Sequence, residues 1–251
     1  MASTETSGTG DIERSLELLW GTGERPTRGP KPGLSLERIV GAAVGIADAE
    51  GLDAVSMRRL SQELGAGTMT LYRYVPGKAE LLDLMLDRVQ GPTSTEYPAH
   101  DWRASVSAIA HDTLAGLRRH PWLLHVNQAR PVLGPNVLAN MEKMVGALRG
   151  TGLTDQEVVS VIVAVDGYVS GVARTQVNAL EAAQRSGTTE EEFWRAQEPV
   201  LVRIMSTGEF PLMASLDDNA FDFTYDHFGF GLARLIDGLD AFISRRGVGE
   251  A

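Results

Sequence analysis

Hydrophobic residues recur every three or four positions along most of this chain. Between residues 34 and 51, apolar side chains occupy positions 36, 39, 40, 43, 44, 46 and 47, with a serine before them at 35 and a glycine after them at 51. This spacing gathers the apolar side chains on one face of an α-helix, and serine and glycine are favoured at its two ends. No segment shows the alternation of a half-buried strand, so the pattern predicts an all-α protein.

The same spacing divides the chain into two groups of helices. The N-terminal group is predicted at 36–50, 56–65, from Thr68 to just before Pro76, and 77–91; the C-terminal group is predicted at 101–119, 122–128, 135–149, 154–184, 189–206 and 217–246. We therefore expect two domains, 35–90 and 91–251. Residues 1–34 are rich in Gly, Pro, Ser and Thr, which predicts a flexible extension, although residues 12–20 have the pattern of two amphipathic turns.

Two of the predicted helices, 154–184 and 217–246, are apolar around much of their circumference and contain small residues such as Gly167 and Gly171. A helix that is apolar on more than one side needs packing partners on more than one side. Two interpretations stay open from the pattern alone. The helices form the centre of the domain core, or one face of each forms a homodimer interface in a four-helix bundle.

The composition is that of a soluble protein, with 43% hydrophobic and 22% charged residues among 251. The absence of cysteine excludes disulfides and thiolate metal sites and suits a reducing cytoplasm. The N-terminus is polar and lacks the apolar core of a signal peptide. The longest apolar run, 158–169, is interrupted by Ser160 and Asp166 and is too short to span a membrane. We therefore expect a cytoplasmic protein that makes no membrane contact.

The charge is unevenly distributed. The whole chain carries a net charge of −10, yet residues 54–78 hold four cationic side chains against Glu63 alone. Residues 25–34 add Arg25, Arg28 and Lys31 without an acidic residue. Local clusters decide which surface meets a polyanion, so the acidic average does not exclude nucleic acid.

Residues 56–78 have the pattern of a helix-turn-helix. Leu60 and Leu64 face inward on the first helix, the Gly65-Ala66-Gly67 break supplies the turn, and Leu71 and Val75 face inward on the second. At 100° per residue, Arg73, Met69 and Thr70 then point away from the core, with Tyr72 and Tyr74 at its flanks. Arginine can pair with guanine, and the methyl groups of Thr70 or Met69 can contact thymine. An ordinary helical hairpin with solvated arginines is the alternative at this point.

A family resemblance favours DNA binding. Residues 36–82 resemble the N-terminal domain of the TetR family of bacterial transcriptional repressors, and the residues that carry the likeness lie in 39–85, in particular LDAVSMRRLSQELG, TLYRYV and GKAELL. The resemblance implies a base-contacting helix at 68–74, a base contact from Arg58, and phosphate contacts from Tyr72, Tyr74 and Lys78. Arg73 departs from the commonest family pattern, so an operator sequence cannot be transferred. The residues expected to bind DNA are Arg58, Thr68, Met69, Thr70, Tyr72, Arg73, Tyr74 and Lys78.

The basic segment ahead of the first helix of this domain has two interpretations. Arg25, Arg28 and Lys31, spaced among Pro and Gly, fit an arm that lies in the minor groove or along the DNA backbone. A solubilising tail fits equally well.

No catalytic or metal-binding motif is present, and the five histidines show no metal-ligand spacing, so we expect no enzymatic activity, metal or cofactor. Residues 101–246 resemble the family's ligand-binding and dimerisation domain more weakly, which implies a pocket for a small-molecule effector. The candidate wall residues are Trp102, His111, Trp122, His125, Met141, Met144, Asp166, Tyr168, Phe193 and Trp194. The same Met and Trp residues also suit a plain core. Asp166 needs a partner in its apolar helix, such as Arg174, a second subunit or a ligand.

These observations predict a homodimeric, ligand-responsive DNA-binding transcriptional regulator. The expected mechanism is repression from a palindromic double-stranded operator, relieved by a small-molecule effector. The alternative is a helical-bundle small-molecule binding protein or enzyme whose basic hairpin serves packing.

Overall fold

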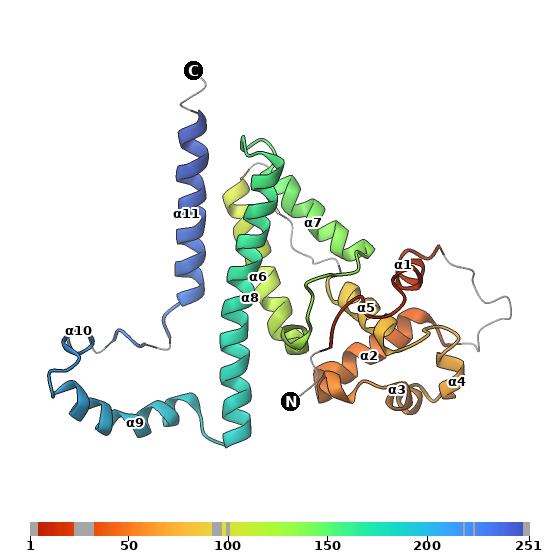
Figure 1. The fold of residues 1–251 in the computed structure, drawn as a ribbon, viewed down its shortest axis with the longest axis horizontal. Coiled ribbons are helices and arrows are strands. Elements are labelled where there is room, and N and C mark those ends of the chain that lie inside the picture. Colours follow the sequence, from red (N-terminus) through yellow and green to blue (C-terminus); the bar gives the residue numbers. More distant parts are fainter. Residues whose placement is uncertain are drawn as a thin grey trace.

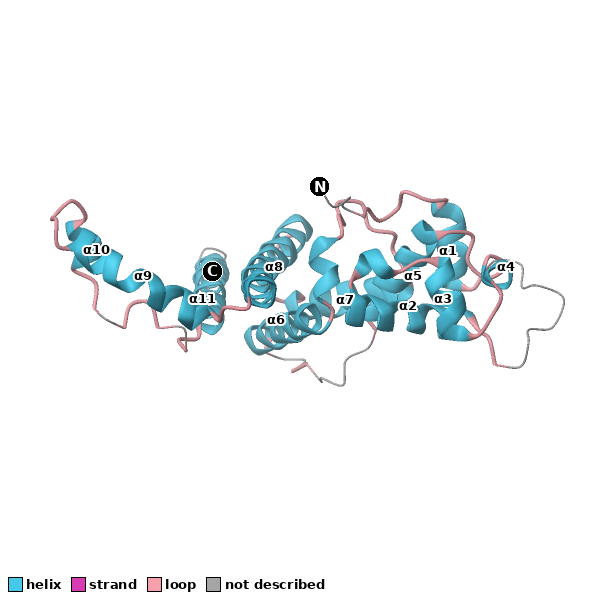
Figure 2. Ribbon diagram, turned by 90° about the horizontal axis from the view of Figure 1, so that it is seen from below, coloured by secondary structure: helices cyan, strands magenta, loops and turns pink. Residues whose placement is uncertain are grey.

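The computed structural model describes residues 5–22, 33–91, 97–98, 101–217, 219–222 and 224–247. Apart from one isolated bridge between Thr6 and Asn127, the regular structure of these residues is helical, which confirms the all-α prediction (Figures 1 and 2). The elements are α1 (Ile12–Trp20), α2 (Leu36–Glu50), η1 (Leu52–Ala54), α3 (Met57–Leu64), α4 (Thr68–Leu71), α5 (Lys78–Val89), α6 (Trp102–Arg119), η2 (Pro121–His125), α7 (Pro135–Leu148), α8 (Asp155–Ser186), α9 (Glu190–Met205), α10 (Pro211–Ala214) and α11 (His227–Gly247).

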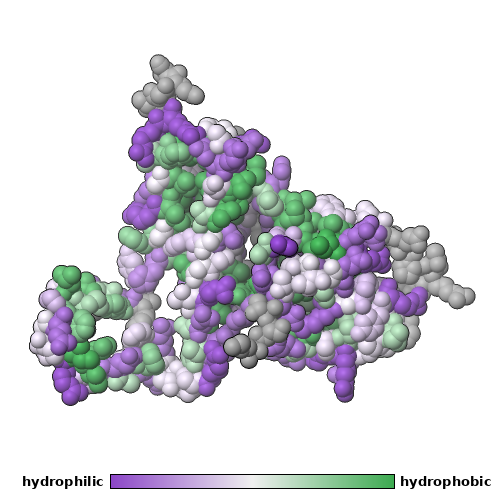
Figure 3. Space-filling model, viewed as in Figure 1, coloured by the Kyte–Doolittle hydropathy of each residue, from purple (hydrophilic) through white to green (hydrophobic). Residues whose placement is uncertain are grey.

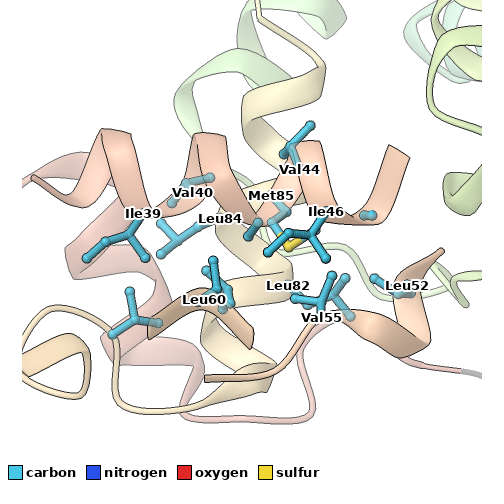
Figure 4. Packing of buried hydrophobic residues seen from close by; sticks show 14 of the residues in the cluster. Ile39, Val40, Val44, Ile46, Leu52, Val55, Leu60, Leu82, Leu84 and Met85 are labelled. Carbon is cyan, nitrogen blue, oxygen red and sulfur yellow. The ribbon is translucent and has the colours of Figure 1, made fainter. Parts of the chain in front are cut away.

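In the N-terminal domain α2 packs on both α5 and α3, and α4 packs on α3. Ser35 and Ser56 cap α2 and α3 by accepting the amide hydrogens of Arg38 and Arg59 at 3.1 Å. Gly65 ends α3 in the left-handed region, at φ 60°, where a side chain is disfavoured. The fully buried side chains come from the helices of the domain and from the loops between them: Ile39, Val55, Leu60, Leu71, Val75, Leu81 and Met85. Figure 4 labels Ile39, Val55, Leu60 and Met85 of this group.

The C-terminal domain, residues 91–251 in the sequence analysis and called the effector domain below, is built around α8, which packs on α6, α7 and α11. Its core includes Val106 and Ala110 of α6, Leu148 of α7, Val169 of α8 and Leu232 of α11. The two domains meet at α5 and α7, and in the short η2 segment, whose Trp122 is buried within the N-terminal core. Packed side chains therefore join the N-terminal domain to the C-terminal domain.

Helices α9 and α10 project from the body as an arm, seen in both views of the ribbon (Figures 1 and 2). No residue of either helix is buried. Large apolar side chains on this arm are exposed instead, among them Phe193, Trp194, Val202, Phe210 and Leu212. An arm that exposes so many apolar side chains indicates a surface that another molecule covers.

Three predicted helices differ in extent. The last long helix begins at His227 rather than at 217, because Asp226 accepts the Gly229 amide at 2.8 Å and starts the helix there. The predicted helix 122–128 is a 3₁₀ segment that ends at His125, since Asn127 pairs with the N-terminal residues instead. The helix that begins at Thr68 stops at Leu71 and continues only as turns.

The N-terminal extension differs more strongly from the flexible segment that its composition predicts. Residues 12–20 form α1, which packs on α5, and residues 5–11 lie along the same helix. The physical reason is a set of polar contacts with buried carboxylates of α5, described below. Gly, Ser and Thr in this segment are therefore donors in a docked structure.

Candidate nucleic-acid interface and effector domain

The exposed face of α4 and of the turn that follows it, residues 72–74, carries the groups that the sequence pattern placed there. Leu71 and Val75 are completely buried and anchor the helix, while Met69 is 77% exposed and Tyr72 is 44% exposed. Arg73 is exposed beside them, and Thr68 and Thr70 are half-buried at the start of the helix. A thioether, an aromatic ring and a guanidinium thus project together from a rigid support, as a surface that reads base edges requires.

The two adjacent arginines at the start of α3 have different roles. Arg59 donates to Glu50 Oε1 at 2.7 Å and to Glu63 Oε2 at 2.9 Å. These bonds raise the pKa of Arg59 and lower the pKa of Glu50. Arg58 is exposed and forms no ion pair with any described residue. Arg59 therefore holds α2 and α3 together, and Arg58 is the member of the pair with a free guanidinium.

Two further predicted contact residues are already engaged within the chain. The Tyr74 hydroxyl donates to the Leu34 carbonyl at 3.3 Å, and its ring packs against the N-terminal core. Lys78 Nζ lies 2.8 Å from Glu5 Oε1. The sequence analysis instead predicts that the Tyr74 hydroxyl and the Lys78 ammonium are free to contact DNA phosphates. Arg25, Arg28 and Lys31, the basic residues of the predicted arm, lie outside the described residues.

Three carboxylates on one side of α5 hold the elements around it, and sequence reasoning did not identify them. Glu80 accepts the Asp11 amide at 2.9 Å. Asp83, only 2% exposed, accepts hydrogen bonds from the Ser7 and Ser15 hydroxyls and from the Gly8 amide, at 2.9 to 3.0 Å. The available signal was a run of acidic residues three and four positions apart in an otherwise apolar helix.

Asp87 is the third carboxylate, and it joins the two domains. It accepts the backbone amides of Asn136 and Val137, at 3.0 and 3.1 Å, and the Asn136 side-chain amide at 2.9 Å. These donors lie in the first turn of α7, whose unpaired amides need an acceptor. A Cβ on Gly134 would come within 2.3 Å of the Asp87 carboxylate, so glycine is needed for this approach.

The predicted effector residues do not form one group. His111 packs edge-on against Phe228 at 5.0 Å, and the Tyr168 hydroxyl donates to the Phe228 carbonyl at 2.8 Å, so these two gather where α6, α8 and α11 meet. Trp102 packs against the core of this domain and Met144 is buried in it, whereas Met141 is exposed on α7.

The other candidates lie elsewhere. Trp122 is 3% exposed within the N-terminal core, where its Nε1 donates to Asp48 at 2.7 Å. His125 Nε2 lies 3.0 Å from Glu181 Oε1. Phe193 and Trp194 stand on the α9 arm, away from the effector-domain core (Figure 1). A single chain therefore does not bring these four residues together with the other candidates.

Asp166 keeps its unusual character in the structure. Desolvation by the surrounding protein raises the pKa of its carboxyl group, although the residue retains exposed surface on α8. Arg174, one of its predicted partners, donates instead to the Leu124 carbonyl at 2.9 Å. Within the described residues the carboxyl forms no ion pair, which leaves a second subunit or a ligand as its predicted partner.

A groove of about 610 Å³ separates the two domains beside η2. Its wall includes Glu5, Glu50 and Asp53 from the N-terminal side, and His125, Arg174 and Glu181 from the effector side. Of the predicted effector residues, only His125 lines it. The described residues contain no group of three or more metal-binding side chains.

Comparisons with known proteins identify the family of this chain. Residues 39–85 match the family described as bacterial regulatory proteins, tetR family, and residues 95–243 match the tetracyclin repressor-like C-terminal domain. The chain belongs to the TetR family. This TetR-family protein is 58% identical over 246 residues to the HTH-type transcriptional repressor DrrR1 of Streptomyces coeruleorubidus, across 97% of this chain and 91% of that relative.

Two further relatives extend the comparison. An HTH-type transcriptional regulator of Saccharopolyspora erythraea is 34% identical over 169 residues, across 67% of this chain and 71% of its own. The structure of ActR from Streptomyces coelicolor in complex with actinorhodin has a TM-score of 0.70 and 31% identity, across 84% of this chain and 97% of that chain. The TetR-family protein is thus a DNA-binding transcriptional regulator rather than an enzyme, which confirms both predictions.

Proposed function

We propose that this TetR-family regulator is a repressor that binds a palindromic operator in the bacterial cytoplasm and is released by a small-molecule effector. The observation that carries the proposal is the exposed surface of α4 and the following turn, where Met69, Tyr72 and Arg73 project and the buried Leu71 and Val75 anchor the segment. The 58% identity to a protein named as a repressor supports the direction of regulation.

The proposed operator contacts follow from exposure and chemistry. Arg73 and Thr70, with Met69 beside them, read base edges in the major groove, and the free guanidinium of Arg58 reaches a base from α3. Tyr72 and Lys78 contact phosphates, and Tyr74 supports the reading surface through its hydrogen bond to the Leu34 carbonyl. Phosphate contacts supply affinity, and base contacts supply specificity.

The proposed dimer forms through α8 and α11. On α8, Val159 and Val163 are 56% and 66% exposed, and on α11, Phe230 is 52% exposed. By length and composition, α8 is also apolar enough to cross a membrane. Only part of this apolar helix is buried within the single chain, so apolar surface remains for a second copy to cover. Figure 3 shows hydrophobic surface over the upper part of α8 and α11 and again on the arm. A second copy would cover these faces in a four-helix bundle.

Two glycines of α8 favour the same interface. A Cβ added to Gly167 or Gly171 would meet no atom of this chain within 4 Å. Glycine in a helix interior costs about 0.5–1 kcal/mol relative to alanine, so some gain must offset it. Close approach of a partner helix provides that gain.

The proposed effector acts within the α6–α8–α11 part of the domain, near His111 and Tyr168. The related ActR structure, in complex with actinorhodin, supports a small-molecule effector for this chain. Effector binding would shift α7, and this shift would reach α5 because Asp87 of α5 holds the first turn of α7. A change in α5 then alters the spacing of the two α4 helices in the dimer.

The test is operator binding measured by fluorescence anisotropy at several salt concentrations, on DNA from the promoter of the gene itself. Arg73→Ala should weaken specific binding by about 1–3 kcal/mol, or roughly 5- to 150-fold. Arg185→Ala removes an equal charge from the exposed end of α8 and should leave binding unchanged. Equal and weak binding of the parent protein to all DNA sequences would contradict the proposal.

A further inference from the structure

The docked N-terminal segment, residues 5–22, is called the strap here, and it touches both domains. On the N-terminal domain it binds Glu80 and Asp83 of α5 through Asp11, Ser7, Gly8 and Ser15. This contact is buried and rich in hydrogen bonds, so it fixes the path of the strap along α5.

The effector domain holds the two ends of the strap. The Asn127 amide donates to the Glu5 carbonyl at 2.9 Å, and the Ser7 amide donates to the Asn127 carbonyl at 3.1 Å. At the other end, Trp20 Nε1 donates to the Leu133 carbonyl at 3.1 Å. Asn127 therefore holds the backbone of Glu5 and Ser7, and the Glu5 side chain extends from a fixed point.

The Glu5 side chain reaches the first residue of α5. Its Oε1 lies 2.8 Å from Lys78 Nζ, and the two side chains keep 30% and 37% of their exposure. Gly77 caps α5 without a side-chain hydrogen bond, so the first turn of the helix offers free amides beside the ammonium group. A carboxylate thus occupies the place where ammonium and helix amides would otherwise hold a phosphate.

We propose that Glu5 is an internal competitor of operator DNA for Lys78. The inference rests on the proposed phosphate contact of Lys78. In the free protein the Glu5 carboxylate neutralises Lys78, and operator binding requires that a DNA phosphate replaces this carboxylate. The strap thereby lowers the affinity for all DNA, because the competition occurs at a phosphate contact and carries no sequence information.

The size of the effect follows from the exposure of the pair. Ion pairs that remain about one-third exposed contribute little, so a phosphate can displace Glu5. Removal of the competitor should tighten binding about two- to fivefold per subunit. The strap then adjusts DNA affinity without preventing binding.

The first experiment measures operator affinity and its salt dependence for Glu5→Gln, Glu13→Gln, Lys78→Met and the Glu5→Gln/Lys78→Met double variant. Glu13 is exposed on the same strap, so Glu13→Gln is the matched control for the lost charge. We expect tighter binding for Glu5→Gln only. Lys78→Met should weaken binding and lower the salt slope by about 1 per subunit, and the double variant should equal Lys78→Met.

The other outcomes separate this inference from the proposed function. If Lys78→Met weakens binding but Glu5→Gln does not change it, the competition is refuted and the operator contact stands. An equal gain from Glu5→Gln in the Lys78→Met background refutes it as well, since the gain is then a general charge effect. If Lys78→Met leaves affinity and salt slope unchanged, the operator contact itself fails.

The second experiment needs no DNA. The chain has three lysines, Lys31, Lys78 and Lys143, and acetylation of each by an activated acetyl ester can be followed by mass spectrometry. Glu5→Gln should raise the acetylation rate of Lys78 at least twofold relative to Lys143, and Glu13→Gln should not. An unchanged rate for Lys78 means that the ion pair is not maintained in solution and overturns the proposal.

Discussion

The substitution Asp83→Ala is the most direct test of how the strap is held. Asp83 is 2% exposed, and its two oxygens accept three hydrogen bonds from the strap: from Ser7, Gly8 and Ser15. Hydrogen bonds to a charged group contribute about 1.5–3 kcal/mol each. The upper limit for the stability lost with all three bonds is therefore well above about 4 kcal/mol. Detachment of the strap would return the three donors to water and reduce this cost. We therefore expect a loss of about 2–4 kcal/mol in the free energy of unfolding.

The assay is urea unfolding followed by circular dichroism at one fixed protein concentration, because a dimer unfolds in a concentration-dependent way. Asp83→Asn is the matched variant: it keeps one acceptor oxygen and the side-chain shape, so its loss should be smaller. Limited trypsin digestion gives a second measurement. Cleavage after Arg14, in the first turn of α1, should become fast in Asp83→Ala because the strap has left α5. Stability within 0.5 kcal/mol of the parent, with Arg14 still protected, would refute the reasoning.

Three further predictions concern other parts of the molecule. Gly65→Ala places a side chain at φ 60°, and thermal unfolding should show a loss of about 1 kcal/mol, whereas Gly45→Ala within α2 should not. Val163→Glu should convert the dimer to a monomer in sedimentation velocity, and Leu138→Glu on α7 should leave it a dimer. The raised pKa of Asp166 means that its ionisation disfavours folding, so Asp166→Asn should raise Tm at neutral pH, with a gain that disappears as the pH falls below about 4. A gain that is constant with pH would contradict that cause.

The periodic pattern of the sequence predicted the helices of the N-terminal domain closely, because each helix carries its own local signals. Ser35 and Gly51 enclose α2, and Ser56 and Gly65 enclose α3, as the structure shows. The exposed face of α4 followed from the buried positions of Leu71 and Val75. These features depend on neighbours within a few residues, which is the range that a sequence pattern reports.

The strap and the effector residues depend on distant contacts that no local pattern contains. Asp83 meets Ser7 and Ser15 across 76 and 68 residues of chain, so polar residues that suggest disorder become part of a docked segment. Trp122 and Met144 have the composition of pocket residues, yet both are buried in cores. Aromatic and thioether side chains serve either purpose, and only the three-dimensional arrangement distinguishes them.

The three carboxylates of α5 limit the ways in which that helix can move. Glu80 and Asp83 hold the strap, and Asp87 holds the start of α7, all from one side of the helix. Rotation of α5 about its own axis would take every carboxylate away from its donors at once and would leave buried charges without partners. Tilting or sliding keeps the bonds if the strap and α7 move as well. The helix therefore cannot turn about its own axis while these bonds last. Any displacement that reaches α4 is a rigid-body movement of α5 together with the strap and α7.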